Sequence, residues 1–107
     1  MTNDPKAPKI KVFKKYGKIK ADPHVTLGNR RDSSNNAVKI EWSAKYSTDE
    51  LDITFRDSGC VNKTTKSCSG NKCSYLTDLT YQGDKVCKYN IILNREEEDP
   101  ILVIDDN

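Results

Sequence analysis

Val38-Lys39-Ile40-Glu41-Trp42 and Leu51-Asp52-Ile53-Thr54-Phe55 decide the fold class, because apolar and polar side chains alternate strictly in both stretches. Side chains on a β-strand point alternately to its two faces, so each stretch predicts a strand with one buried and one wetted face. The polar segment 45–50 between them has the length of a hairpin loop. The two stretches therefore predict two β-strands joined by a short polar connection.

The same two-residue period recurs on both sides of these stretches. Further strands are expected at residues 10–13, 25–27, 75–81, 86–93 and 100–104, with turn signals such as Gln82-Gly83-Asp84 between them. No segment has the length and apolar stripe of an amphipathic helix. The 107 residues have room for one domain, spanning residues 1–107. About seven short strands predict an all-β fold, a small antiparallel, Greek-key-like β-sandwich.

Three polar segments are expected to lie outside these strands. Residues 1–8 are expected to be flexible, and residues 28–36 contain only Gly, Asn, Arg, Asp and Ser, which is typical of an exposed loop. Residues 57–74 are rich in Ser, Thr, Asn, Lys and Gly and offer little to bury. They predict a long loop that needs a covalent or coordinative constraint to be ordered.

Four cysteines, Cys60, Cys68, Cys73 and Cys87, lie in or after that loop. Two disulfides are the leading interpretation, because closing loops of this length stabilises a small domain by about 2 to 4 kcal/mol each. A nested pairing, Cys60 with Cys87 and Cys68 with Cys73, suits a hairpin-like excursion. One alternative is a zinc site made by all four thiolates, although only the spacing of Cys68 and Cys73 comes near that of usual structural sites. The other alternative is four free thiols in a reducing compartment.

Parts of the chain resemble known sandwich families. Residues 22–27 and 38–42 are similar to the paired early strands of cupredoxin-like domains, and Cys87-Lys88-Tyr89-Asn90-Ile91 is similar to a late strand of cupredoxin-like or immunoglobulin-like domains. Both resemblances imply a Greek-key sandwich. A blue-copper site in such a fold needs two histidines and a cysteine, whereas His24 is the only histidine. The resemblance therefore implies the architecture without the copper, and we expect no cofactor.

Basic residues gather in the first third of the chain and acidic residues at its end. Residues 1–31 hold nine Lys or Arg against two Asp, and residues 94–107 hold Arg95 against six acids. Mutual attraction of these two segments is one interpretation. The other is a nucleic acid or other polyanion bound by the basic residues, with Phe13 and Tyr16 among them to stack on bases. The candidate residues are Lys11, Lys14, Lys15, Lys18, Lys20, Arg30 and Arg31, with Lys6 and Lys9 before them.

The sequence offers no catalytic constellation. His24 would have to serve any Ser-His-Asp or Cys-His arrangement, and no nucleophile motif accompanies it. The acids at 96–99 are contiguous, a pattern typical of a solvated turn. We therefore expect no enzyme and no catalytic residue. A thiol-based activity at Cys68 or Cys73 is the remaining enzymatic alternative.

Protein binding is the function that these patterns favour. A rigid β-scaffold presents loops such as 28–36 and 62–72 to a partner, as in an inhibitor, an immunity protein, an adaptor or an accessory subunit. Polyanion binding through the Lys-rich N-terminal third is the alternative, since a pI of about 8.3 is below that of strongly basic nucleic-acid-binding domains. No run approaches the roughly 18 apolar residues of a membrane span, and the start of the chain lacks the apolar run of a secretory signal. A soluble chain with no membrane partner is expected.

Overall fold

The computed structural model describes residues 7–106, which form ten β-strands and no helix. The strands are β1 (Lys9–Lys15), β2 (Lys18–Asp22), β3 (Val25–Asn29), β4 (Lys39–Ala44), β5 (Leu51–Phe55), β6 (Val61–Ser69), β7 (Lys72–Thr77), β8 (Lys85–Leu93), β9 (Glu96–Glu98) and β10 (Ile101–Asp105). The predicted all-β fold class is confirmed. No described residue belongs to a helix that is long and apolar enough to cross a membrane.

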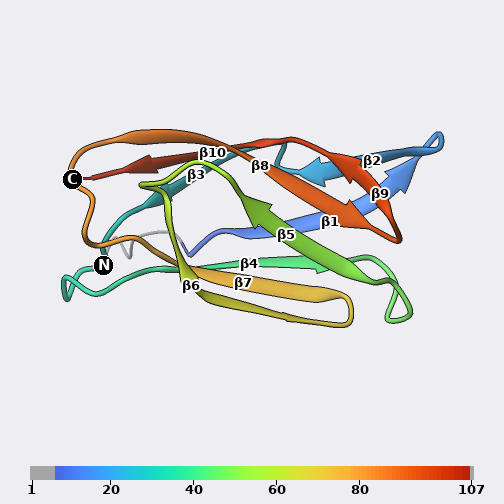
Figure 1. Cartoon of the computed structure of the whole chain (residues 1–107), viewed down its shortest axis with the longest axis horizontal. Coiled ribbons are helices and arrows are strands. Elements are labelled where there is room, and N and C mark those ends of the chain that lie inside the picture. Colours follow the sequence, from blue (N-terminus) through green and yellow to red (C-terminus); the bar gives the residue numbers. More distant parts are fainter. Residues whose placement is uncertain (1–6, 107) are drawn as a thin grey trace, which may run out of the picture.

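The strands form two sheets that pack together (Figure 1). One sheet, which we call sheet A, has the strand order β2-β1-β4-β7-β6. The other, sheet B, has the order β3-β10-β8-β5, and β9 pairs with β8. In Figure 1, β4, β7 and β6 lie in the lower part of the view, and β3, β10 and β8 lie in the upper part.

The core lies between the sheets because alternate side chains of most strands point inward. Its buried side chains form one cluster that draws on both sheets, among them Ile10, Val12, Ile40, Trp42, Ile53, Tyr89, Ile91, Leu102 and Ile104. Trp42 is central, since its ring lies edge-on to Phe55, Tyr75 and Tyr89 with centroids 5.4 to 6.0 Å away. Such edge-to-face pairs add to the stabilisation that comes from burial alone.

The structure has more strands than the sequence predicted. Residues 57–74 were expected to form a loop, but most of them belong to the hairpin of β6 and β7. The sequence pattern does not reveal β6 because its side chains after Val61 are exposed or half-buried on both faces. β9 consists of three glutamates, and β2 alternates Lys18, Ile19, Lys20 and Ala21 over only five residues.

The sheets are mixed, whereas an antiparallel sandwich was predicted. β1 runs parallel to β4, and β3 runs parallel to β10. Each parallel pair joins an early strand to a strand made later in the chain, and such pairing leaves no trace in local sequence patterns. The expectation of a flexible 1–8 segment falls mostly on residues outside the described part. Of the two residues of this segment that are described, Pro8 is buried, and its carbonyl accepts a hydrogen bond from the Glu41 N–H at 3.0 Å.

Candidate binding surfaces

The four cysteines form two disulfides, Cys60–Cys87 and Cys68–Cys73. These are the pairs of the nested arrangement expected from the spacing. Cys60–Cys87 joins the loop before β6 to β8 in the core, and Cys68–Cys73 joins β6 to β7. The carboxylate of Asp52 and the two sulfurs of the second pair lie within 4.8 Å of one another. Both the zinc and the free-thiol alternatives need unpaired sulfur atoms, and these bonded sulfurs are not thiolates.

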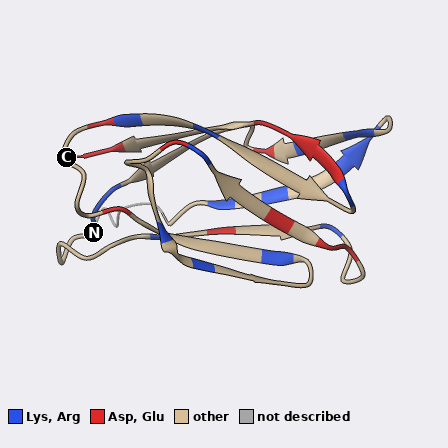
Figure 2. Ribbon diagram, in the orientation of Figure 1, with Lys and Arg blue, Asp and Glu red and all other residues tan. Residues whose placement is uncertain are grey.

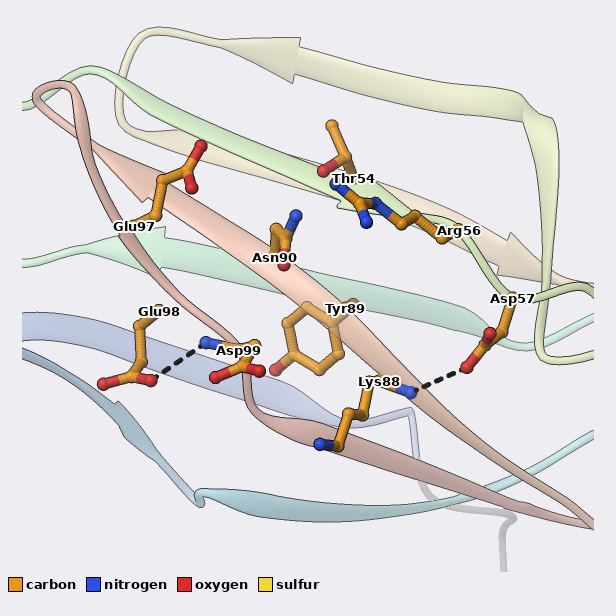
Figure 3. Close-up of a pocket in the computed structure, with 9 residues that line it drawn as sticks. All are labelled: Thr54, Arg56, Asp57, Lys88, Tyr89, Asn90, Glu97, Glu98 and Asp99. Carbon is orange, nitrogen blue, oxygen red and sulfur yellow. Dashed lines mark hydrogen bonds between the residues drawn. The ribbon is translucent and has the colours of Figure 1, made fainter.

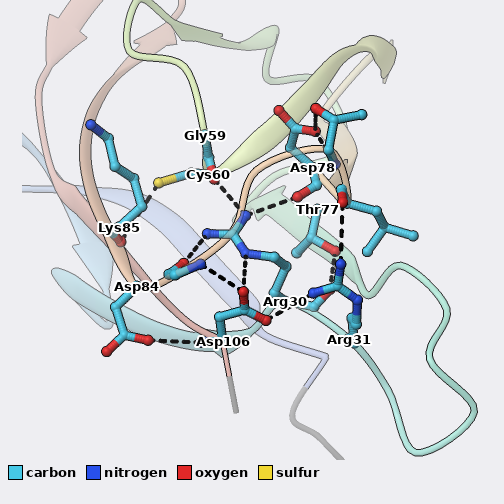
Figure 4. A network of polar contacts seen from close by, with 12 residues as sticks. Arg30, Arg31, Gly59, Cys60, Thr77, Asp78, Asp84, Lys85 and Asp106 are labelled. Atoms are coloured by element: carbon cyan, nitrogen blue, oxygen red, sulfur yellow. Dashed lines mark hydrogen bonds and ion pairs between the residues drawn. The ribbon is translucent and has the colours of Figure 1, made fainter.

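Arg30 was expected on a polyanion-binding surface, but its side chain is fully buried. Its guanidinium donates hydrogen bonds to three backbone carbonyls: Nη1 to Gly59 at 2.5 Å and Asp78 at 2.9 Å, and Nη2 to Gly83 at 2.6 Å (Figure 4). Its Nε lies 3.6 Å from the carboxylate of Asp106, and its guanidinium lies 5.0 Å from the ring centre of Tyr81.

The position of Arg30 follows from the period of β3. Thr26 and Gly28 point inward, and two residues later Arg30 does the same. A buried guanidinium is tolerated only where partners satisfy its N–H groups, and three loop carbonyls meet here. Arg30 therefore holds the ends of several loops together, and the prediction that it binds an external anion is wrong.

Two other predicted basic residues also have partners inside the molecule. Arg31 forms an ion pair with Asp106 at 2.8 Å and donates to the carbonyl of Leu79. Lys14 forms an ion pair with Glu96, which joins β1 to the start of β9. This contact supports the predicted attraction between the basic and acidic segments, and Figure 2 shows basic residues along β1 and β2 beside acidic β9.

Lys6 lies outside the described residues. The outer face of sheet A carries the other remaining predicted lysines together with three that the sequence did not single out. We call this set the lysine face: Lys9, Lys11, Lys15, Lys18, Lys20, Lys39, Lys45 and Lys72, all exposed. The strand registers bring them together, because Lys11 pairs with Asp22 on one side and Ser43 on the other, and Ser43 pairs with Lys72. The face contains two carboxylates, those of Asp22 and Glu41. Buried and exposed side chains alternate along β4, so the sequence alone indicates that Lys39 faces outward. Only the sheet order shows that β4 lies beside β1.

The outer face of sheet B carries an aliphatic block of five side chains: Val25 and Leu27 of β3, Ile101 and Val103 of β10, and Val86 of β8. In the ladder, Leu27 pairs with Val103 and Val103 with Val86. Val25 pairs with Ile101 in the neighbouring row. Val25, Leu27 and Val86 are 47%, 59% and 59% exposed. Exposed apolar side chains in one contiguous patch mark an interaction site more often than scattered ones do.

β3 lies at the edge of sheet B beside this block. The carbonyl of His24 accepts from the Ile101 N–H, and the Arg30 N–H donates to the Asp105 carbonyl, so the even-numbered residues face β10. The N–H and C=O groups of Val25, Leu27 and Asn29 therefore point away from β10, because these groups alternate sides along a strand. No other strand of the described part pairs with that side.

A depression of about 530 Å³ lies between β5, β8 and β9 (Figure 3). Its charged lining residues are Arg56, Asp57, Lys88, Glu97, Glu98 and Asp99. Two of its carboxylates accept backbone hydrogen bonds: Asp57 from the Lys88 N–H at 3.2 Å and Glu98 from the Asp99 N–H at 3.0 Å. Neither histidine nor cysteine is among the residues that line it.

Two tyrosines have raised pKa values because their hydroxyl groups are buried in the core. Burial raises the pKa of Tyr89 to about 12, and burial also raises the pKa of Tyr75. The Tyr75 hydroxyl donates to the Ile53 carbonyl at 2.6 Å, so it ties β7 to β5. His24, the only histidine of the sequence, is exposed just before β3, and its carbonyl accepts a hydrogen bond from the Ile101 N–H in the ladder to β10.

Comparison of the chain with models of known protein families gives no match, and comparison with curated proteins gives none either.

Proposed function

We propose that this protein is a non-enzymatic binding module that holds an extended segment of another protein along the outer edge of β3. The observation that carries the proposal is the coincidence, at the same residues, of a strand edge with no partner strand among residues 7–106 and an exposed aliphatic block. Val25 and Leu27 present their backbone groups to the edge and their side chains to the outer face. An added strand would gain main-chain hydrogen bonds and apolar contact together.

The sheet edges at β2, β5 and β6 carry features that discourage strand addition. β2 has Lys18 and Lys20, and β6 has a register shift between its pairings with β7. β5 is joined to β6 by an ion pair between Asp52 and Lys66 at 2.7 Å. Charged side chains and irregularities are the usual protection of edge strands. β3 contains no lysine, no proline and no register shift.

An extended segment suits this site better than a large rigid partner. The aliphatic block has only five side chains. The area that they can bury is much smaller than the ~800 Å² per partner that a stable interface between rigid proteins buries. Main-chain hydrogen bonds compensate for a small apolar area when a strand is added. The partner segment should carry aliphatic side chains at alternate positions. This mode of binding is compatible with an inhibitor, an immunity protein, an adaptor or an accessory subunit.

The test uses a synthetic peptide of alternating valine and threonine and observes the backbone amides by NMR. We expect the amide signals of Val25, Leu27 and Asn29 to shift on addition of peptide. Leu27→Pro removes an N–H that faces the edge and should weaken binding about tenfold while the fold is kept, since edge strands tolerate proline. Ile53→Val, a change in the core on β5, which lies at the opposite edge of sheet B from β3, is the control for lower stability alone. β3 amides that do not move at millimolar peptide would overturn the proposal.

A further inference from the structure

We propose that the lysine face is a second binding site, and that its ligand is a linear sulfated polysaccharide. The site is independent of the β3 edge, because it lies on the outer face of the opposite sheet. Eight exposed lysines and two carboxylates occupy it, although the net charge of the whole chain is only +2. The asymmetry produces a positive surface on a nearly neutral molecule, and such surfaces attract anionic polymers over several ångströms.

Protection of a sheet edge does not explain these lysines. Lysines on β2 have that role, since β2 is the edge of sheet A. Lys9, Lys39 and Lys72, however, lie on β1, β4 and β7, which are the three interior strands of the sheet. Each of these strands has a neighbouring strand on both sides. A lysine at these positions therefore adds charge to the outer face of the sheet and does not protect an edge strand.

The charges of the lysine face also have no ion-pair partner among the described residues. Within residues 7–106, ion pairs involve Lys14, Arg30, Arg31 and Lys66, and none of these four belongs to the lysine face. Lys15 and Lys18 are direct cross-strand partners, an arrangement of like charges that destabilises a hairpin. A bound polyanion would relieve this repulsion, so the face is arranged for a ligand at some expense of stability.

Two depressions on this face combine lysines with hydroxyl groups. The first, of about 290 Å³, is lined by Lys9, Lys39 and Lys72 and by serines at positions 43, 67, 69 and 74. The second, of about 460 Å³, is lined by Lys11, Lys45 and Phe13 and shares Ser43 with the first. Serine hydroxyls can donate to sulfate oxygens and to sugar hydroxyls, and lysines supply the charge. Because Ser43 lines both depressions, a linear chain can cross from one to the other.

The residue types favour a sulfated polysaccharide over a nucleic acid. Arginine is the side chain that stacks on bases and forms bidentate contacts with phosphates, and the lysine face contains none. Single-stranded nucleic acid needs exposed aromatic platforms, whereas Phe13 is half-buried and Tyr16 stands apart at the tip of the β1–β2 hairpin. The two disulfides are typical of oxidising compartments, where sulfated polysaccharides occur.

The experiment measures binding of a fluorescent heparin dodecasaccharide by polarisation at several salt concentrations. The triple variant Lys9→Gln, Lys39→Gln, Lys72→Gln should weaken binding at least tenfold and make the affinity less sensitive to salt, because fewer counterions are released. The control is Lys63→Gln, Lys88→Gln, Arg95→Gln, which removes the same charge from other surfaces. It should change the affinity less than threefold. Glu41→Gln removes a carboxylate from the first depression and should strengthen binding.

Three results would overturn the proposal. If both triple variants weaken heparin binding equally, the net charge of the protein attracts the probe and the lysine face is not a specific site. Tighter binding of a single-stranded DNA of matched charge would assign the face to nucleic acid. Absence of heparin binding at 50 mM salt would exclude the site outright. A circular dichroism spectrum and a melting temperature like those of the wild type are required of every variant before it is scored.

Discussion

The indole Nε1 of Trp42 in sheet A donates a hydrogen bond to the hydroxyl of Tyr89 in sheet B at 3.1 Å. Both side chains are buried, so neither group has water as a substitute partner. Tyr89→Phe would leave the indole N–H unsatisfied and should lower the free energy of unfolding by about 1 to 3 kcal/mol. Urea unfolding measures the loss. Tyr46→Phe, at a residue that is 60% exposed, should stay within about 0.5 kcal/mol of the wild type.

Alkaline pH should destabilise the protein through the same tyrosine. The pKa of Tyr89 is raised to about 12 in the folded state, so the unfolded chain loses this proton first, near pH 10. The unfolded state then binds fewer protons than the native state, and stability falls between pH 10 and about pH 12. The slope from one such group is about 1.4 kcal/mol per pH unit. Unfolding between pH 9 and 11 should show a shallower decline for Tyr89→Phe than for the wild type. Parallel declines would contradict this assignment.

Arg30→Lys should destabilise the fold much more than Arg31→Lys. A lysine at position 30 cannot reach the carbonyls of Gly59, Asp78 and Gly83 together, and its charge would remain buried. We expect a loss of about 3 kcal/mol, as for other broken buried ionic networks. Arg31 is partly exposed, and its replacement should cost less than about 1 kcal/mol. Guanidinium chloride unfolding compares the two variants, and similar losses would mean that the carbonyl contacts of Arg30 contribute little.

The two disulfides should contribute unequally to stability. Cys60–Cys87 spans 27 residues and Cys68–Cys73 spans five. Loop-closure entropy predicts about 3.5 kcal/mol for the longer span and about 2 kcal/mol for the shorter one. Cys60→Ala with Cys87→Ala should therefore lower the unfolding midpoint more than Cys68→Ala with Cys73→Ala. The reverse order in chemical unfolding of the two double variants would argue against the entropic explanation.

Lys18→Glu should stabilise the β1–β2 hairpin while it weakens polyanion binding. It converts the like-charged pair of Lys15 and Lys18 into an opposite pair, worth about 0.2 to 1 kcal/mol. Thermal unfolding should show this gain at low salt and a smaller one in 1 M NaCl, where the charges are screened. Heparin binding of the same variant should be weaker than that of the wild type. A variant that is neither more stable nor weaker in binding would contradict the account of the lysine face.

The alternating pattern was sufficient to predict the all-β class and most strands of the core. The segments Val38 to Trp42 and Leu51 to Phe55 each have one buried and one solvent-facing side. Apolar and polar residues therefore alternate in their sequences, and this alternation identifies them as strands. β6 was missed because both of its faces meet water and its sequence therefore resembles a loop. The parallel pairing of β1 with β4 was also missed, because it is decided by how distant strands share one core and not by either strand alone.

The binding surfaces were only partly predictable for a related reason. Arg30 and Arg31 look alike in the sequence, yet one is buried and the other half-exposed. Extending the two-residue period of β3 from Thr26 and Gly28 would have identified Arg30 as inward-facing. The aliphatic block needs β3, β10 and β8 in register, and that order follows from the fold of the whole chain.

β10 occupies an interior place in sheet B, between β3 and β8. During translation β3 leaves the ribosome early, but residues 101–105, its partner in the described structure, leave long afterwards. Until then the nascent chain displays both sides of β3 and the aliphatic side chains that β10 later joins. The ladders of β10 with β3 and with β8 can therefore form only after residues 101–105 are available, so this part of sheet B is completed late.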